Sequence, residues 1–483
     1  MSTTVIIITV CAYLLFMFGI AWLAGSKSDN SAFFSGSRKS KWYIAALAMI
    51  GAPMSGVTFV SVPGMVAASS FSYLQMCVGF VAGYLVISFV LIPLFYKLNV
   101  VSIYQYLENR FGASSYKTGA WFFFISKMLG ASVRFFLVCL VLQLLIFDPL
   151  GLPFILNVII SVLIVFAYTF TGGVKTVIWT DSFRTVCMIL AVVLGIIFIS
   201  RGMGMDFGGL VASIKGSEMS RIFFFDDVKE SMYFWKQFLG GLFTAVAMTG
   251  LDQDMMQRPL SCKDPRDSRK NMITSGIMQV FVVFLFLCLG VLLYQFAAAN
   301  GISETGDKIF AAVATSGLLP GIVGVLFIIG LVASAYGAGG SALTSLTTSF
   351  TVDILGAMKH GETQLTKTRK IVHVGMAVLM AIVIIVFNKL SNTSAINAVY
   401  TLASYTYGPI LGMFAFGLAC KRKVKDRFVP LVAILAPALC LVLQLNSDRW
   451  FGGYKFSYEI LLINAVFVIL GLCCLIEKEK QGK

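Results

Sequence analysis

Long apolar runs separated by short polar stretches fill most of the chain. Crossing the hydrocarbon core of a bilayer takes about 20 consecutive apolar residues in a helix. Runs of roughly this length or longer lie at 4–24, 43–68, 74–96, 119–147, 152–171, 177–200, 234–256, 272–298, 316–352, 371–388, 394–419, 428–446 and 457–476. The pattern predicts an all-α polytopic membrane protein with about 13 transmembrane helices. The ninth run is long enough to include a turn outside the membrane.

Composition and charge support this class and give an orientation. Hydrophobic residues make up 58% of the chain, charged residues only 12%, and the mean hydropathy is +0.88. The net charge of +15 is compatible with nucleic-acid binding, but its distribution argues against it. The loops that start at 25, 97, 172, 257, 353 and 420, with the C-terminal tail, hold 25 of the 37 Lys and Arg residues, and the alternate loops hold 9. The positive-inside rule therefore places the N-terminus outside and the C-terminus in the cytoplasm.

Neither the first apolar run nor the cysteines and histidines indicate a processing signal, a metal centre or a reactive site. No basic stretch precedes residues 4–24 and basic residues follow them, so we expect a retained transmembrane helix and no cleaved signal peptide. This favours a bacterial inner membrane. The ten cysteines are scattered without a CxxC pair, and two histidines are too few for a histidine-based metal centre. With no nucleophile–base set and no phosphate loop, the sequence does not suggest an enzyme.

Helix-breaking residues cluster at the centre of the run 43–68. Gly51, Pro53 and Gly56 lie there, and Ser55 and Thr58 are spaced to share a helix face. Broken backbone at membrane depth is tolerated where it lines a cavity or is buried in protein. A kinked helix whose hydroxyls bond their own carbonyls is the alternative. A second Gly-Pro break is expected at Gly408-Pro409, in the run 394–419.

Charged residues inside the apolar runs are functional candidates, because they are costly at membrane depth. Arg134 lies near the middle of the run 119–147 and needs a carboxylate, carbonyls or a bound anion; an ion pair with Asp181 is the structural alternative. Lys127 lies seven residues earlier on roughly the same face. Asp181 and Arg184 are one helical turn apart in the run 177–200.

Several motifs resemble the sodium/solute symporter family. They are Tyr168-Thr-Phe-Thr-Gly-Gly-Val-Lys-Thr-Val-Ile-Trp-Thr-Asp181, Asp252-Gln-Asp-Met-Met-Gln-Arg258, the segment 330–353 that closes with Phe-Thr-Val-Asp353, and Gly408-Pro409-Ile-Leu-Gly412. The resemblance extends from about residue 30 to 425. It implies a LeuT-type fold with two inverted five-helix repeats, 43–200 and 234–420, each with a broken first helix, and a site at the midplane between them. Residues 1–25 would add an N-terminal helix and residues 427–476 two peripheral helices, in a protein that we expect to be monomeric.

The resemblance also implies site residues. An Arg at the position of Arg134 is thought to meet the carboxylate in members that carry acidic solutes. The substrate candidates are Ser55, Thr58, Gln75, Arg134 and Tyr405. Sodium would lie between the broken helix, the helix of Asp181 and the segment 330–353, with Gly51, Met54 and Ser334 as candidate ligands. We assign Asp252, Gln253, Gln257 and Arg258 to hydrogen bonding at a gate.

The chain departs from the family at this ion site. Members usually carry Gln where Arg184 stands, and two adjacent hydroxyl residues where Gly337 and Ala338 stand; of the neighbouring hydroxyl positions only Ser341 remains. One hypothesis is that the Arg184 guanidinium replaces the sodium ion. The alternative is that Arg184 pairs with Asp181 while sodium binds through carbonyls.

The sequence therefore predicts a secondary active transporter of a small polar solute, with a carboxylate-bearing one favoured: an acidic sugar, an organic acid or an amino acid. No cofactor is expected other than sodium as a possible coupling ion, and the partners are the solute and the bilayer. Two alternatives stay open. One is a sodium-independent or proton-coupled carrier or exchanger, and the other is a transporter-like membrane sensor.

Overall fold

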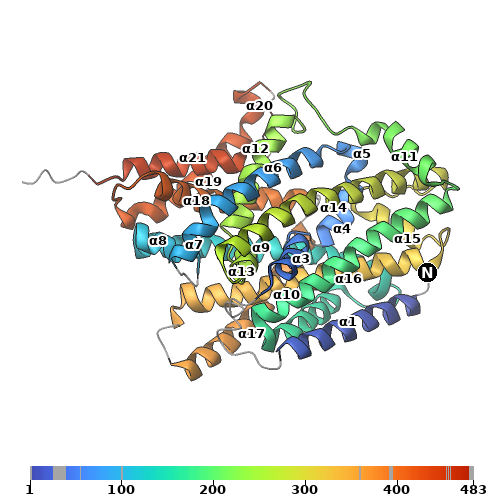
Figure 1. Cartoon of the computed structure of the whole chain (residues 1–483), viewed down its shortest axis with the longest axis horizontal. Coiled ribbons are helices and arrows are strands. Elements are labelled where there is room, and N and C mark those ends of the chain that lie inside the picture. The colour runs from blue at the N-terminus through green and yellow to red at the C-terminus, as the bar shows by residue number, and fades with distance from the viewer. Residues whose placement is uncertain are drawn as a thin grey trace, which may run out of the picture.

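The computed structural model describes residues 3–25, 40–54, 56–98, 102–357, 361–390, 395–452, 454, 456 and 458–477, and these residues form helices without a β-strand. The long helices lie side by side and run in roughly the same direction (Figure 1). Nine of the described helices are long and apolar enough to cross a membrane, and three shorter apolar helices accompany them. The all-α polytopic prediction is confirmed, and the count of about 13 spans stays a prediction.

The first helices are α1 (Thr3–Gly25), α3 (Trp42–Gly51), α4 (Gly56–Gly64) and α6 (Tyr73–Val86). Residues 52–54, which follow α3, are not helical, as the Gly51-Pro53-Gly56 cluster predicts. A π-helical turn, η2 (Ile87–Leu91), joins α6 to α7 (Ile92–Leu98), and α8 (Gln105–Arg110) precedes α9 (Ala113–Leu142), which ends in the π-turn η3 (Gln143–Phe147). Ser55 lies outside the described residues.

Helix α10 (Phe154–Gly202) contains two apolar spans, 154–170 and 177–202. Its residues Tyr168 and Arg184 would be about 24 Å apart along a straight helix. Both nevertheless contact the same turn of α16 (Gly321–Ser349). Tyr168 donates a hydrogen bond to the carbonyl of Tyr336, and the Arg184 side chain lies against Gly337. The chain therefore reverses direction within α10, and its two spans pass the same part of α16.

A second interrupted helix faces the first. Helix α12 (Phe234–Ala245) continues through the π-turn η5 (Val246–Gly250), and helix α13 (Gln253–Leu260) follows after Leu251 and Asp252. The Asp252 carboxylate caps α13 by accepting from Met255 N at 3.0 Å, and the Tyr104 hydroxyl donates to the Leu251 carbonyl at 2.8 Å. The break leaves these backbone groups without helical partners, and side chains supply the missing bonds.

The remaining helices surround this core. They are α5 (Val66–Ser69), α11 (Phe207–Gly216), η4 (Glu218–Ser220), α14 (Pro265–Ala299), η6 (Gly306–Lys308), α15 (Ile309–Thr315), η7 (Phe350–Ile354), α17 (Glu362–Leu390), α18 (Ala395–Ala419), η9 (Asp426–Phe428), α19 (Val429–Leu445), α20 (Ser447–Trp450) and α21 (Ile460–Cys474). Helix α1 packs on α10 and α16, and α21 packs on α18 and α19.

The break expected at Gly408-Pro409 is wrong, because α18 runs through both residues. Proline cannot donate to the carbonyl four residues earlier, which is that of Tyr405. Asn464 of α21 replaces the missing donor: its side-chain amide donates to the carbonyls of Ser404 and Tyr405, at 3.0 and 3.1 Å. Gly408 leaves the room for this contact, since a Cβ there would lie 2.4 Å from Asn464.

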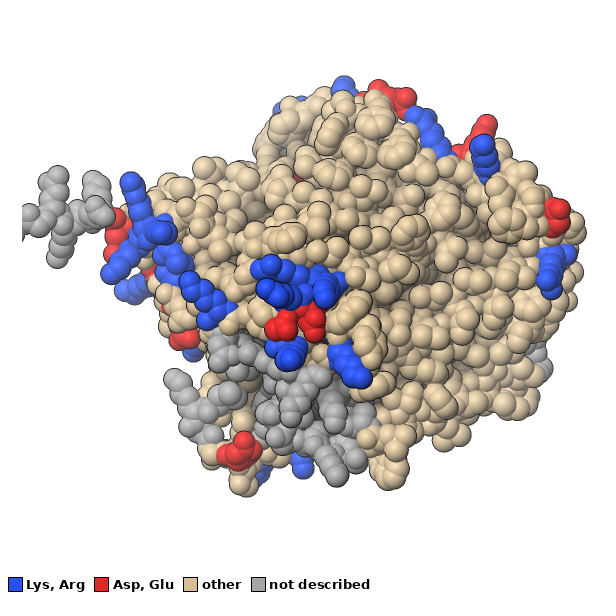
Figure 2. Space-filling model, in the orientation of Figure 1, with Lys and Arg blue, Asp and Glu red and all other residues tan. Residues whose placement is uncertain are grey.

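The surface charge is uneven (Figure 2). Lys and Arg side chains gather toward the left of this view, over α7, α8 and the connection between α13 and α14, while a broad uncharged area lies to their right. Lys263, Arg266 and Lys270 are exposed at the α13–α14 connection. Such an uncharged band beside a basic end is typical of a membrane-embedded helical protein.

Candidate substrate and ion sites

The two helix breaks border a cavity of about 60 Å³ between α4, α6, α9 and α14, which we name the inner cavity. Arg134 of α9 lines it, together with Thr58 of α4 and Met54 of the first break. Tyr84 of α6 donates to Gln279 of α14 across its wall, at 2.7 Å. Its other lining residues are Pro53, Tyr73, Phe80, Thr244, Ala245, Met248, Thr249, Met255, Val283 and Tyr400.

Arg134 is the charged group of this cavity. Its guanidinium forms no hydrogen bond and no ion pair with any residue that the structure describes, and its alternative partner Asp181 is engaged elsewhere. A planar guanidinium presents donors in a fork that matches a carboxylate. The site can therefore bind an anionic group and hydrogen-bond its polar substituents through the threonine hydroxyls.

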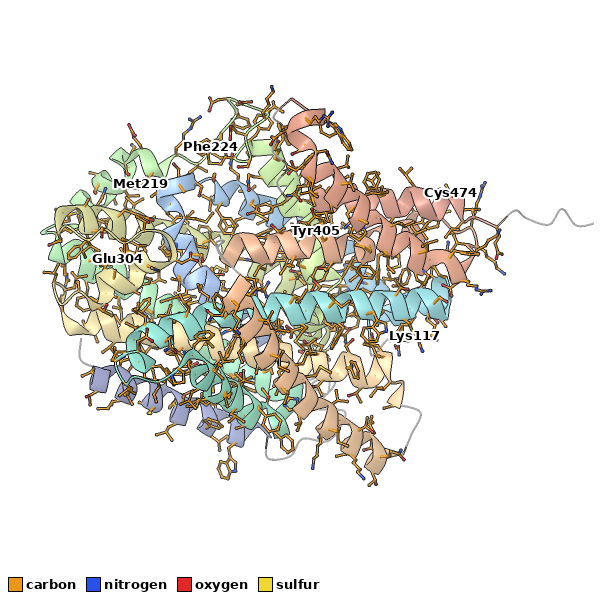
Figure 3. All side chains as sticks on the ribbon, turned by 180° about the vertical axis from the view of Figure 1, so that it is seen from behind. Lys117, Met219, Phe224, Glu304, Tyr405 and Cys474 are labelled. Carbon is orange, nitrogen blue, oxygen red and sulfur yellow. The ribbon has the colours of Figure 1, made fainter. Side chains whose placement is uncertain are left out.

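A larger, open vestibule of about 1170 Å³ lies on one side of the inner cavity. Tyr73 lines both spaces, and its hydroxyl shares a 2.8 Å hydrogen bond with that of Tyr400. This tyrosine pair separates the vestibule from Arg134. Glu304 and Tyr405 line the vestibule; in Figure 3, Glu304 lies toward one end of the molecule, Lys117 and Cys474 toward the other, and Tyr405 between them.

On the side away from the vestibule lies what we name the ion network: Lys127, Asp181, Arg184, Asp252, Asp254 and Arg258. Each of these side chains is at most 6% exposed. Lys127 Nζ lies 2.7 Å from Asp254 and 3.2 Å from Asp252, which also accepts from the Tyr407 hydroxyl at 2.5 Å. The network joins α9, α10 and α13, and Tyr407 of α18 contacts it.

Arg258 is the centre of the ion network. It binds Asp181 Oδ2 through Nη2 at 2.6 Å and Nε at 3.0 Å, and Asp254 Oδ1 through Nη1 at 3.3 Å. Nη2 also donates to the Ser341 hydroxyl at 2.6 Å, and Ser341 donates to Asp254 at 2.5 Å. Three cations face three carboxylates, so the network is neutral when all six are ionised. Buried charges require this pairing, because an unpaired one costs several kcal/mol.

Arg184 occupies the position between the first helix break and α16. Its Nη2 donates to the Gly51 carbonyl at 2.6 Å and lies 3.4 Å from Asp181 Oδ1. A Cβ at Gly337 would lie 2.5 Å from Arg184 Cδ and 2.6 Å from its Nη1. The guanidinium therefore fills the space that a side chain at residue 337 would take. The nitrogens Nε and Nη1 have no hydrogen-bond partner among the described residues.

This arrangement does not suit a sodium ion at the predicted position. Hard cations prefer several oxygen ligands. Gly337 and Ala338 carry no hydroxyl, the Gly51 carbonyl is bonded to Arg184, and the Ser334 hydroxyl donates to the Gly330 carbonyl of its own helix at 2.5 Å. At Gly340 a Cβ would overlap the Tyr168 hydroxyl. Arg184 and Tyr168 of α10 thus occupy the space that side chains at residues 337 and 340 of α16 would take.

The other predicted site residues are placed as follows. Thr58, Met54 and Arg134 meet at the inner cavity, and Ala338 and Ser341 line a water-sized gap beside it. Gln75 lies outside this cavity, where it binds the backbone of Met232 at 2.9 Å and of Phe224 at 3.1 Å. Tyr405 lies in the vestibule and donates to Gln444. Sequence reasoning missed Tyr84, Gln279 and Tyr400, although polar residues inside apolar runs were a signal for them.

Two interrupted helices around a central cavity, within a bundle of apolar helices, define a membrane transporter of the LeuT-type fold. The sequence profile of the sodium:solute symporter family matches residues 33–426, so the chain belongs to this family of transporters, which are not enzymes. The family resemblance is confirmed.

Comparisons with individual proteins agree. A sodium/sialic acid symporter of Aliivibrio fischeri is 26% identical over 468 residues, which cover 92% of this chain and 88% of the relative. The human sodium-coupled monocarboxylate transporter 2 is 25% identical over 410 residues, covering 81% of this chain and 64% of the relative. A solved Na⁺-coupled sialic acid symporter in a substrate-bound outward-open state shares the fold, with a TM-score of 0.82, 19% identity and 97% of each chain covered.

Proposed function

We propose that the protein moves a small carboxylate-bearing solute across the membrane by alternating access. The observation that carries this proposal is Arg134, a half-buried guanidinium that lines the inner cavity without a partner among the described residues. Uncompensated charge inside a membrane protein is costly and marks substrate sites. A carboxylate would satisfy it, and the threonine hydroxyls beside it would accept or donate hydrogen bonds to a hydroxylated solute.

The relatives support this class of solute. Sialic acids and monocarboxylates, which name two of the relatives, both carry a carboxylate. The cavity of about 60 Å³ has room for a few water molecules. An organic acid of few carbons suits a cavity of this size, and an acidic sugar would need the tyrosine pair or the ion network to move apart.

Solute-dependent thermal stability of the purified protein tests the proposal. Lactate, N-acetylneuraminate and glutamate are titrated separately, because a solute that binds the folded state raises stability by mass action. In Arg134→Gln the affinity for the stabilising carboxylate should fall by about 10–100-fold, since a hydrogen bond to a charged group contributes roughly 1.5–3 kcal/mol. Arg201→Gln is the matched control, because Arg201 is exposed at the end of α10. Equal affinity in the wild type and Arg134→Gln would refute the role of Arg134.

We further propose that no sodium ion binds between α3 and α16, because the Arg184 guanidinium supplies the positive charge there. Its 2.6 Å bond to the Gly51 carbonyl and the absence of hydroxyls at Gly337 and Ala338 support this. Two cations at one position would repel each other. The family's coupling ion is sodium, so this chain would work without sodium at that site.

Thermal stability in sodium, potassium or choline at constant ionic strength checks this second proposal. We expect the same unfolding temperature in all three salts, with and without the stabilising carboxylate. A sodium-specific rise would mean that a sodium site exists despite Arg184, and Arg184 would then be assigned a structural role.

The organisation proposed for the chain follows the family. Residues 43–200 and 234–420 form the two inverted repeats, preceded by 1–25 and followed by 427–476. The two interrupted helices, α3–α4 and α12–α13, stand at the start of these segments, which supports the division. The protein would lie in the inner membrane with the vestibule facing outward and the basic ends facing the cytoplasm.

A further inference from the structure

We infer that this carrier is an exchanger, which moves one carboxylate inward only as it moves another outward. The inference rests on the proposed function and concerns the same site. Its starting point is the charge balance around Arg134, the group that would bind the solute.

All buried carboxylates next to Arg134 are already compensated. Asp252 accepts from Lys127, from Met255 N at 3.0 Å and from the Tyr407 hydroxyl at 2.5 Å. Asp254 is held by Lys127 at 2.7 Å and by Arg258. Arg134 and Asp252 line a common gap of about 20 Å³, yet no hydrogen bond joins them. Arg134 therefore adds one positive charge beside the neutral ion network.

This surplus charge affects the two halves of a transport cycle differently. A carrier passes through a state closed on both sides, and here the tyrosine pair and the ion network lie on the two sides of the inner cavity. With a carboxylate bound, the closed state has no net charge at Arg134. Without one, closing the cavity would enclose the Arg134 guanidinium, which is half-buried in this structure and has no counter-ion among the described residues, and an uncompensated buried charge costs several kcal/mol. The loaded carrier therefore changes sides readily, and the empty carrier does not.

Arg184 takes the position of the coupling ion, whose release would normally contribute to the return of the empty carrier. A coupling ion that leaves with its solute changes the charge of the core at each release. The Arg184 guanidinium is covalently attached, bonded to Gly51 and enclosed against Gly337, so it stays in place when the solute leaves. Release of an ion from this position therefore cannot contribute to the return of the empty carrier. Return requires a second carboxylate, which makes the process an exchange.

The test uses purified protein in liposomes. Uptake of radiolabelled lactate, N-acetylneuraminate or glutamate is measured into two sets of vesicles. One set contains the same unlabelled compound at about 5 mM, a few times the upper end of typical KM values. The other set contains none. Uptake into loaded vesicles should be at least about tenfold faster, which corresponds to about 1.4 kcal/mol. The rates should be unchanged by a sodium gradient or by a potassium diffusion potential, because exchange of like anions moves no net charge.

Arg134→Gln provides an internal check. Its neutral side chain no longer penalises the empty closed state, so residual uptake should be nearly equal in loaded and empty vesicles. A purely structural role for Arg134 would reduce both rates and leave their ratio high.

The outcomes separate the two proposals. Equal uptake into loaded and empty vesicles, or uptake driven by a sodium gradient, would refute exchange while the carboxylate-transporter function stood. No uptake of any of the three carboxylates under either condition would refute both.

Discussion

At the scale of single residues, Arg184 and Gly337 form a matched pair. The guanidinium fills the space in front of residue 337, where a Cβ would come within 2.5 Å of Arg184 Cδ. Gly337→Ala alone should therefore destabilise the protein by about 1–3 kcal/mol through overpacking. In the background of Arg184→Gln, whose side chain is shorter, the same substitution should cost much less.

A double-mutant cycle measured by thermal unfolding checks this pair. We expect a coupling energy of roughly 0.5–3 kcal/mol, the range for residues in contact. Gly375→Ala serves as the control, because a Cβ at Gly375 would meet nothing within 4 Å. Additive effects of the Gly337 and Arg184 substitutions would mean that the guanidinium does not occupy this space.

The same pair shows what the sequence could predict at this scale. The replacement of Gln by Arg184 and of two hydroxyl residues by Gly337 and Ala338 predicted a changed ion site, and the structure brings Arg184 and Gly337 together. The sequence did not predict that Asp181 binds Arg258 more closely than Arg184, since the 2.6 Å contact joins residues 77 positions apart. Spacing along one helix reveals neighbours on that helix, whereas pairing between helices depends on how they dock.

At the scale of elements, the ion pairs of the ion network connect α13 to α9 and α10. Lys127 bridges Asp252 and Asp254 at the start of α13. Lys127→Met would leave two buried carboxylates without that partner, and breaking a buried ion pair costs about 3–5 kcal/mol. We expect a fall of several degrees in the unfolding temperature of the purified protein.

Lys97→Met is the control for this substitution. Lys97 is exposed in the last turn of α7, so its loss should change stability by less than about 0.5 kcal/mol. If the two variants unfolded at the same temperature, the contacts of Lys127 would not stabilise α13.

Helix breaks were only partly predictable. Gly51, Pro53 and Gly56 interrupt the first core helix as expected, but Gly408 and Pro409 do not interrupt α18. The difference comes from Asn464, 55 residues after Pro409, which donates to the carbonyl that proline leaves free. A local sequence pattern indicates where a helix has lost a hydrogen bond, and only the fold reveals whether another side chain replaces it.

At the scale of the whole molecule, orientation in the membrane is the property still to be measured. Lys308 is exposed beside the vestibule, and Lys425 is exposed in the basic segment before α19. Excess Lys and Arg residues face the cytoplasm. In a background without native cysteines, Lys308→Cys should react with a membrane-impermeant maleimide added to intact cells, and Lys425→Cys should react only after the membrane is permeabilised. The two variants control each other, because both positions are exposed lysines close to the start of a helix. Labelling of Lys425→Cys in intact cells would reverse the proposed orientation, and the vestibule would then open toward the cytoplasm.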